Sequence, residues 1–530
     1  MTESPQWWAD GVGYQVYVPS FQDSNGDGWG DLPGVTSRLG YLSDLGVTIV
    51  WLSPIHPSPF ADHGYDVSDY RAVNPRFGTL HDLATLLSEA GDRGLRVLMD
   101  LVPNHTSEEH EWFRQAREDR HSRYRDFYIW RDPGPGGGPP NNWVSRFGGS
   151  AWAWDEEAGQ YYLHLFARSQ PDLNWRNPAV AEEFDSIMSG WLDLGFSGFR
   201  VDVPHVVLKH PDLPDNPLVP EDKVITDVRG SREWWRFQHR YDMDQPDLLD
   251  IYARWHAVTA PRGAMLLGEV NITDPGRLGR HTAGGGLDAV FWFGLIEHRW
   301  EPDRFTEWTR QALDGAAGLV WVLSSHDRPR APSRYGGGTA GRRRALTLAT
   351  LTAGLPCFPF LYQGDELGLQ DAEVPADRVQ DPLVRYGGAT YPRDAARTPM
   401  PWSAAPGLGF TDSPEPWITL GDRTPEQTVS AQRQDPASTL NAYRRLLRLR
   451  ADDSDLRHGQ LRWLPADESV IGYVRGSTLV AANVSPGPAT ITLPDGRWRV
   501  TFRTDHPHTG DHVTGTAEIP AEHTWIFRRD

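Results

Sequence analysis

Residues 81–105, HDLATLLSEAGDRGLRVLMDLVPNH, combine an amphipathic helical pattern, a glycine-containing turn and a short apolar run that ends in a polar residue. The same unit recurs at residues 184–203, FDSIMSGWLDLGFSGFRVDV. Such alternation predicts parallel strands joined by right-handed helical crossovers. We expect strands over residues 13–18, 48–52, 96–101, 198–202, 264–269, 288–293, 320–324 and 358–362. Eight strands predict an α/β protein with a closed (β/α)8 TIM barrel rather than an open sheet.

The regular alternation is interrupted after the third strand. Residues 104–172 include the run DPGPGGGPPNN, whose prolines and glycines exclude a regular helix or a central strand, so we expect an inserted subdomain there. After a last helix over residues 438–452, alternating apolar runs predict a small C-terminal antiparallel β-domain over residues 458–530. The barrel should therefore comprise residues 1–103 and 173–457.

Composition narrows the class of partner. The 530 residues include 71 acidic and 52 basic side chains, a formal charge of −19, which disfavours nucleic acid and anionic membranes and suits a neutral substrate or a cation. No stretch approaches the roughly 20 apolar residues of a membrane span, and the N-terminal residues lack the pattern of a secretion signal. We therefore expect a cytoplasmic protein, a monomer or small homo-oligomer. The single cysteine, Cys357, excludes an intramolecular disulfide.

Acidic residues stand at the ends of four predicted strands. Asp100, Asp202 and Glu269 end their strands, and His326 and Asp327 follow the seventh. A lone Asp after a strand is usually a turn or helix cap, but in a barrel these ends converge on one face. Carboxylates gathered there repel one another, so the arrangement needs a functional reason. Two carboxyls about 5–5.5 Å apart are what a retaining glycosidase needs, and neighbouring strands four and five supply Asp202 and Glu269.

Four segments resemble, in order, the signature motifs of the alpha-amylase family, glycoside hydrolase family 13, in its α-glucosidase and oligo-1,6-glucosidase branch. They are DLVPNHTS (residues 100–107), GFRVDV (198–203), LLGEV (266–270) and SSHDRPR (324–330). The resemblance covers about residues 7–450. It implies a retaining glycoside hydrolase on a (β/α)8 barrel.

The resemblance also implies a role for each motif residue. Asp202 would be the nucleophile that forms a covalent glucosyl ester, with Arg200 stabilising its anion. Glu269 would be the general acid and base, and Asp327 would bind sugar hydroxyls and stabilise the transition state. Further hydroxyls of the same ring would be bound by His105 and His326.

Two further segments resemble the closed-end pocket of this branch. PFADHGYDVSDY (residues 59–70) carries Asp62 and Tyr65, and RDAARTPMPW (393–402) carries Arg397. An Asp62–Arg397 pair would bind the terminal glucose while Tyr65 stacks on its face, which implies exo action; Arg393 is the alternative arginine. Phe147 and Phe166, in the inserted subdomain, are expected to form an apolar collar at the next subsite.

The run DSNGDGWGD, residues 23–31, places oxygen ligands at alternate positions with glycines that permit a tight loop, as a hard cation requires. It resembles the calcium loop of the same branch. The implied Ca²⁺ is structural, and no organic cofactor is expected. Its ligands would be the side chains of Asp23, Asn25, Asp27 and Asp31 and the carbonyl of Trp29.

Together these features predict a retaining, exo-acting α-glucosidase that releases terminal α-linked glucose from small oligosaccharides or other α-glucosides, with transglucosylation as a second outcome. Val203, after the nucleophile, resembles enzymes acting on α-1,6 bonds, but the context VDVPH differs, which leaves the linkage open. The alternative is a glucosyl transferase or isomerase of the trehalose synthase or sucrose isomerase type. A transporter heavy chain would lack the carboxylates and carry a membrane span, and a sugar-binding module would have no use for Glu269.

Overall fold

Eight parallel strands close into a barrel in the computed structural model, which describes residues 6–220, 233–385, 392–465 and 469–530. The predicted TIM barrel is therefore confirmed, and each strand lies within about two residues of its expected range. The order around the barrel is β1-β11-β10-β9-β8-β7-β3-β2. The strands are β1 (Gly13–Val16), β2 (Ile49–Leu52), β3 (Arg96–Leu101), β7 (Gly198–Val201), β8 (Met265–Gly268), β9 (Ala289–Trp292), β10 (Leu319–Val322) and β11 (Phe358–Tyr362).

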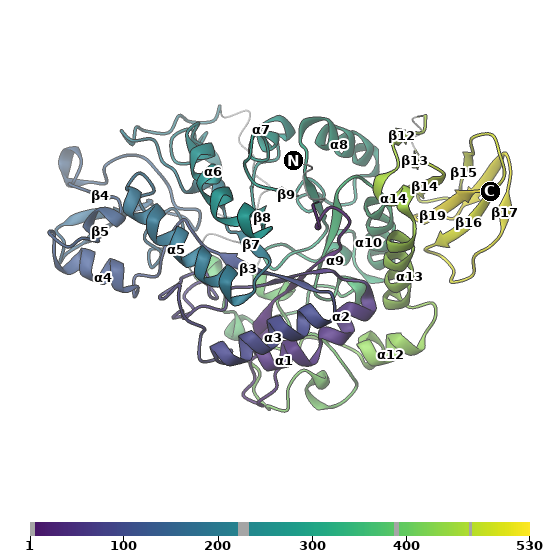
Figure 1. The fold of residues 1–530 in the computed structure, drawn as a ribbon, viewed down its shortest axis with the longest axis horizontal. Coiled ribbons are helices and arrows are strands. Elements are labelled where there is room, and N and C mark those ends of the chain that lie inside the picture. The colour runs from purple at the N-terminus through teal and green to yellow at the C-terminus, as the bar shows by residue number, and fades with distance from the viewer. Residues whose placement is uncertain (1–5, 221–232, 386–391, 466–468) are drawn as a thin grey trace.

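Helices connect successive strands around the barrel (Figure 1). Sequence sets their bounds: α3 begins where Thr79 and Asp82 form a capping box, and its apolar face, which includes Leu83 and Leu86, is buried. The helices between strands are α1 (Leu32–Ser37), α2 (Leu39–Leu45), α3 (Leu80–Asp92), α5 (Pro178–Leu194), α6 (Leu248–Thr259), α7 (Pro275–Arg280), α8 (Pro302–Gly315), α9 (Ala331–Arg334) and α10 (Gly338–Ala353). After β11, short helices α11 (Pro382–Arg385) and α12 (Val429–Gln434) precede α13 (Thr439–Asp452).

The barrel interior is an apolar core rather than a channel. Gly13 illustrates how tightly it is filled, since a Cβ there would lie 2.0 Å from the ring of Phe360. Polar chemistry is therefore confined to the strand ends. The buried side chains of this core include Ile49, Leu98, Met265, Leu267, Phe291, Val320, Val322 and Phe358.

The inserted subdomain follows β3 and forms one end of the molecule, on the left of Figure 1. It contains α4 (Glu111–Glu118) and a three-stranded sheet in the order β4-β6-β5. A bridge between His105 and Asp172 joins its two ends, and Lys209 Nζ, following β7, lies 2.6 Å from Asp172 Oδ2. The subdomain is thus fixed to the barrel mouth at a buried ion pair. The strands are β4 (Trp130–Arg131), β5 (Trp152–Asp155) and β6 (Gln160–Leu163).

A C-terminal antiparallel β-domain forms the opposite end, drawn in yellow in Figure 1 and reached through α14 (Ser454–His458). Glu522, which is 3% exposed, holds this domain to the barrel by ion pairs with Arg343 and Arg344 of α10. The predicted antiparallel domain is confirmed. The larger sheet consists of β12 (Leu461–Trp463), β13 (Val470–Arg475), β14 (Thr478–Asn483), β19 (Thr524–Arg529), β16 (Trp498–Arg503) and β17 (His512–Val513), and the smaller of β15 (Ala489–Thr492) and β18 (Thr516–Ile519).

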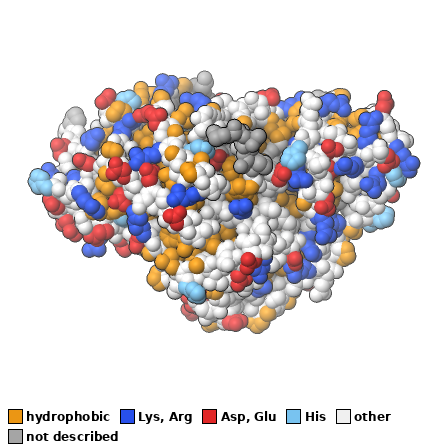
Figure 2. Space-filling model, viewed as in Figure 1, with side chains coloured by type: hydrophobic (Ala, Val, Ile, Leu, Met, Phe, Trp, Pro, Cys, Tyr) orange, Lys and Arg blue, Asp and Glu red, His pale blue; other side chains and the backbone are white. Residues whose placement is uncertain are grey.

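The surface carries mixed charge. On the face shown in Figure 2, acidic and basic side chains are interspersed. Within the ranges that the structure describes, no helix has the length and apolar character needed to cross a membrane.

Gly198, the first residue of β7, offers a test of the barrel geometry. Its φ is +147°, and an added Cβ would lie 2.2 Å from the carbonyl oxygen of Met265. We expect Gly198→Ala to lower the free energy of unfolding by about 3 kcal/mol or more, because both strain and a backbone clash result. Chemical denaturation measures this. Gly190→Ala, in α5 with open space around its Cβ position, should instead raise stability by up to about 1 kcal/mol; equal stabilities of the two variants would contradict the geometry.

Candidate active site

Arg200 occupies the centre of an acidic cluster at the C-terminal end of the barrel. Its Nη1 donates to Asp100 Oδ1 (2.7 Å) and Asp202 Oδ1 (2.8 Å), and its Nη2 donates to Glu269. Asp202 directly follows β7 and Glu269 directly follows β8, and these strands are neighbours. The guanidinium carbon lies 4.4 Å from the ring centre of Trp51 in β2. A single buried guanidinium therefore holds the carboxyls of both adjacent strands in one place.

Three carboxyls around one cation leave an excess of negative charge. Burial raises the pKa of Asp202 well above its usual value, Glu269 and Asp100 raise it further, and Arg200 opposes them. Burial also raises the pKa of Asp100, to about 6. The Asp202 carboxyl therefore binds a proton more readily than an exposed carboxyl does. One member of a carboxyl pair can donate a proton while the other attacks, which is the chemistry of glycosidic cleavage.

Asp327 follows β10 and stays ionised beside this pair. Its Oδ1 accepts from Arg393 Nη1 (3.1 Å) and Arg397 Nη2 (2.8 Å). Burial would raise the pKa of Asp327, but His326 and the two arginines hold it well below the usual range. Burial lowers the pKa of His326 to about 3, and its Nδ1 lies 2.7 Å from Gln15 Nε2. Asp327 therefore presents a permanent negative charge to the pocket.

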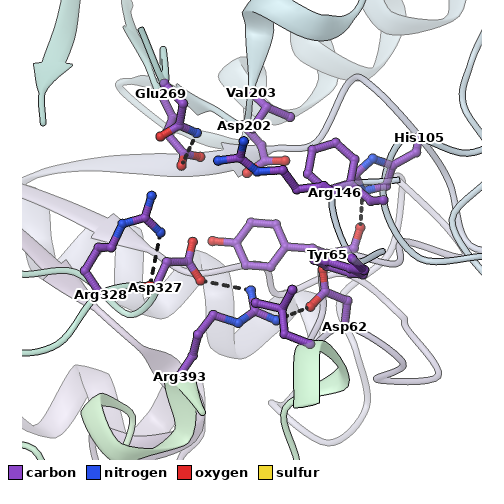
Figure 3. A pocket seen from close by; sticks show the side chains of 14 residues that line it. Asp62, Tyr65, His105, Arg146, Asp202, Val203, Glu269, Asp327, Arg328 and Arg393 are labelled. Carbon is purple, nitrogen blue, oxygen red and sulfur yellow. Dashed lines mark hydrogen bonds and ion pairs between the residues drawn. The ribbon is translucent and has the colours of Figure 1, made fainter. Parts of the chain in front are cut away.

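An ion pair between Asp62 and Arg393 closes one side of the pocket, as Figure 3 shows. Arg393 Nη2 lies 2.8 Å from Asp62 Oδ1 and 2.9 Å from Asp381 Oδ1. The expected pairing of Asp62 with Arg397 is wrong, and the alternative arginine is the partner. Arg397 is fully buried and turns to Asp327 instead. Asp381 explains why Arg393 is the partner of Asp62. It accepts hydrogen bonds from both the backbone N–H and the guanidinium of Arg393 and so orients this side chain towards the pocket.

Tyr65 and His105 form another part of the wall. The Tyr65 hydroxyl donates to Asp100 Oδ2 (2.9 Å), and its ring lies parallel to His326 with centres 5.4 Å apart. His105 Nε2 lies 3.1 Å from the Tyr65 carbonyl oxygen and 3.1 Å from Gln170 Nε2. Burial lowers the pKa of His105 to about 3. Both side chains are thus held in fixed orientations without carrying charge.

These side chains surround one cavity at the mouth of the barrel. Arg200, His326 and Arg397 lie outside its lining, although Arg200 and His326 line a small adjoining cavity with Glu269 and Asp327. No sequence pattern pointed to Arg146, Asn271 or Leu383, and Arg328 lies inside the motif SSHDRPR without an assigned role. The cavity is lined by Asp62, Tyr65, His105, Arg146, Phe147, Phe166, Asp202, Val203, Glu269, Asn271, Asp327, Arg328, Leu383 and Arg393.

The loop over residues 23–31 lies apart from this cavity and is held by its own hydrogen bonds. Asp23 accepts from the backbone N–H groups of Asn25, Gly26 and Gly28 and from Thr411 Oγ1. Asp31 caps α1 through Gly34 N (2.6 Å). The indole ring of Trp29 stacks on Trp417.

In their present orientations, the side chains of residues 23–31 do not form a cation site. The four acceptor positions of the Asp23 carboxylate are all used, so an ion would have to replace some of these contacts. Within the described ranges, no three His, Cys, Asp or Glu side chains are arranged to hold a metal ion. The ligand set of Asp23, Asn25, Asp27, Trp29 and Asp31 therefore stays a prediction.

Comparison with known proteins identifies the family. The profile of the alpha amylase catalytic domain matches residues 15–459. The chain belongs to the alpha-amylase family. It is 40% identical over 508 residues to a probable alpha-glucosidase of Rhizobium meliloti (92% of this chain, 91% of the relative), and 37% identical over 535 residues to an oligo-1,6-glucosidase of Parageobacillus thermoglucosidasius (92% of each).

A solved structure agrees with these sequence matches. The alpha-glucosyl transfer enzyme XgtA superposes with a TM-score of 0.91 at 37% identity over 99% of each chain. The resemblance to the α-glucosidase branch of the alpha-amylase family is thus confirmed. The protein is an enzyme of the glycoside hydrolase class that acts on oligosaccharides or other glucosides.

Arg393→Gln tests the ion-pair cluster of this alpha-amylase family enzyme. It leaves Asp62, Asp327 and Asp381 without their shared cation, so we expect kcat/KM to fall on the order of 100-fold and the melting temperature at pH 7 to fall. The folded pKa values of Asp327 and Asp381 lie below the unfolded value, so the stabilisation is present above about pH 4 and is lost as pH falls further.

The difference in melting temperature between Arg393→Gln and the native protein should therefore stay nearly constant from pH 7 to about pH 5 and shrink as the pH is lowered from about 4 to about 2. Thermal scans across that range measure it. Arg254→Gln is the control, because its ion pair with Asp185 is half-exposed and should contribute no more than about 1 kcal/mol at any pH. A difference for Arg393→Gln that stays constant from pH 7 down to about pH 2 would rule out Asp327 and Asp381 as its cause.

Proposed function

We propose that the enzyme is a retaining, exo-acting α-glucosidase that forms a covalent glucosyl ester on Asp202. The observation that carries this proposal is the position of Asp202 and Glu269 on one guanidinium, at adjacent strand ends and in the lining of one cavity. Relatives named as alpha-glucosidase and oligo-1,6-glucosidase support the same reaction.

In the first step, an Asp202 carboxylate oxygen bonds to the anomeric carbon and the bond from that carbon to the leaving oxygen breaks. Glu269 gives its proton to that oxygen. In the second step, Glu269 takes a proton from water, the water oxygen bonds to the anomeric carbon, and the ester bond to Asp202 breaks. Two inversions give net retention. Arg200 binds both carboxyls and so orients them for each exchange.

Exo action would follow from the closed side of the pocket. Asp62 and Arg393 would present a carboxylate and a guanidinium to the hydroxyls of a terminal glucose, and their ion pair would block the passage of a longer chain. His105 and Tyr65 would contact the same ring. Phe147 and Phe166, with ring centres 6.0 Å apart, would border the following sugar. Arg397 and His326 would not contact the sugar directly, because they lie outside the cavity lining and contact Asp327 instead.

The second candidate is glucosyl transfer, which the similarity to a structure described as an alpha-glucosyl transfer enzyme favours. It uses the same ester but accepts a sugar hydroxyl instead of water. Product analysis on maltose, isomaltose and sucrose separates the two. Free glucose as the main product supports hydrolysis and also reveals the preferred linkage, whereas accumulation of an isomer or longer glucoside supports transfer.

Glu269→Gln tests the assigned chemistry directly. We expect kcat to fall by about 10³-fold or more, because the amide can neither donate the proton nor activate water, while affinity for sugar changes little. Steady-state kinetics and calorimetric binding measure the two quantities. The native enzyme should release the α-anomer first, as detected by NMR. Near-normal turnover by the variant, or initial release of the β-anomer, would end the proposal.

We also propose calcium for the loop over residues 23–31, held by the predicted ligand set. The support is the acidic sequence of the loop. Addition of EGTA should lower the melting temperature, because three unneutralised carboxylates would then lie close together, and Asp27→Asn should reduce that shift. An identical melting temperature with and without EGTA would remove calcium from the proposal. Cytoplasmic location and oligomeric state stay predictions from the sequence.

A further inference from the structure

The pocket contains an arginine that the proposed mechanism does not use. Arg146 lies on the inserted subdomain, in the loop between Trp143 and Ser150, and its side chain extends into the cavity (Figure 3). Its backbone N–H donates to the Leu165 carbonyl oxygen (2.8 Å), and Ser145 N bonds to Gly149 O. The loop that carries Arg146 is therefore fixed, and the guanidinium projects from a rigid base.

The guanidinium of Arg146 has no hydrogen-bond or ion-pair partner among the described residues. Its recorded contacts are the faces of Trp234 and Trp235, whose ring centres lie 5.1 and 5.6 Å from its terminal carbon. These rings hold the cation but do not neutralise it. Burial and the nearby Arg328 lower the pKa of Arg146 to about 10, so it remains charged at neutral pH. Arg146 is partly buried, and its charge faces the cavity without a counter-ion from the described residues, so an anion in the cavity could supply one.

The surrounding carboxylates are already engaged. Glu297 accepts from Arg328 Nε (2.7 Å), Glu269 is bound by Arg200, and Asp327 by Arg393. Arg146 is thus a surplus positive charge in an enzyme whose net charge is −19. Such a charge can favour an anionic ligand over a neutral one of the same shape.

Arg146 also lies on the side of the pocket where the leaving group must sit. In Figure 3 the guanidinium of Arg146 lies on the side of Asp202 and Glu269, whereas Asp62 and Arg393 lie on the opposite side of the pocket. Glu269 protonates the leaving oxygen, so its neighbourhood is the aglycone side, and the Asp62–Arg393 pair closes the opposite, glucose side.

We propose that Arg146 makes the aglycone side of this pocket a subsite for an α-glucoside whose leaving group carries a carboxylate or a phosphate. The proposal rests on the proposed hydrolysis of α-glucosides. The planar fork of a guanidinium matches two oxygens of either anion. The glucose side still selects a terminal glucose, and the anion is held beyond the bond that breaks. No change in the two chemical steps is required.

The test uses matched aryl α-glucosides with the full-length enzyme. The anionic substrates are 4-carboxyphenyl and 4-(phosphonooxy)phenyl α-glucoside, and the neutral substrate is the methyl ester of the first. The quantity measured is the ratio of kcat/KM for each anionic substrate to that for the ester. This ratio is independent of the fraction of folded enzyme, so a partly unfolded variant still gives an answer.

We expect Arg146→Ala to lower the ratio at least ten-fold, with less than a three-fold change on the neutral ester. Arg146→Lys should retain part of the preference, because it keeps the charge but loses the fork. Arg114→Ala, an exposed arginine of α4, should leave the ratio unchanged. Added salt should reduce the preference of the native enzyme.

Two results would overturn the inference. One is an unchanged ratio in Arg146→Ala. The other is an equal loss on neutral and anionic substrates with a shifted pH profile, which would mean that Arg146 acts on Glu269 instead of on the ligand. Failure of the native enzyme to hydrolyse even the neutral ester would count against the proposed function and is thereby distinguished from failure at Arg146.

Discussion

The active site depends on one buried guanidinium. Arg200 binds Asp100, Asp202 and Glu269 at the ends of three consecutive barrel strands, β3, β7 and β8, where water is largely excluded. Without that cation, three carboxyls would be forced together in a region of low dielectric, and the barrel would have to separate them or protonate them. With it, the three carboxyls are held together around one positive charge. The stability of the strand ends and the reactivity of the carboxyl pair therefore have the same source.

Arg393 is a second cation that holds carboxylates together, in this case carboxylates from the loops at the barrel mouth. Arg393 joins Asp62, Asp327 and Asp381, which come from three segments far apart in the chain. Loops of a barrel have no register of hydrogen bonds to fix them against one another, so a buried multivalent ion pair is an effective way to set their relative position. The pocket is thus bounded by two charge clusters. One is built on strands and holds the reacting groups, and the other is built on loops and gives the cavity a closed end.

The two ends of the pocket differ in how their charges are balanced. On the side proposed to bind glucose, Arg393 and Asp62 neutralise each other, which suits a ligand with hydroxyls and no net charge. On the side of Glu269, Arg328 is paired with Glu297, whereas Arg146 rests on tryptophan faces. The inserted subdomain supplies Arg146 together with Phe147 and Phe166, while the barrel supplies the catalytic carboxyls. In the proposed mechanism, selection of the leaving group and cleavage of the bond are therefore carried by different structural units.

The sequence by itself determined the barrel and the position of Asp202, Glu269 and Asp327. Strand and helix patterns are local, and in a parallel barrel the residue that ends a strand lies at the active face whatever the rest of the chain does. Only the tertiary structure decided which arginine meets Asp62. Arg393 and Arg397 are equivalent candidates in the sequence, and the choice rests on Asp381, which fixes Arg393 in place. The tertiary structure alone also decided the environment of Arg146. An arginine in an irregular loop has no periodic signal, and whether it is paired or unpaired depends on which carboxylates the folded chain brings near it.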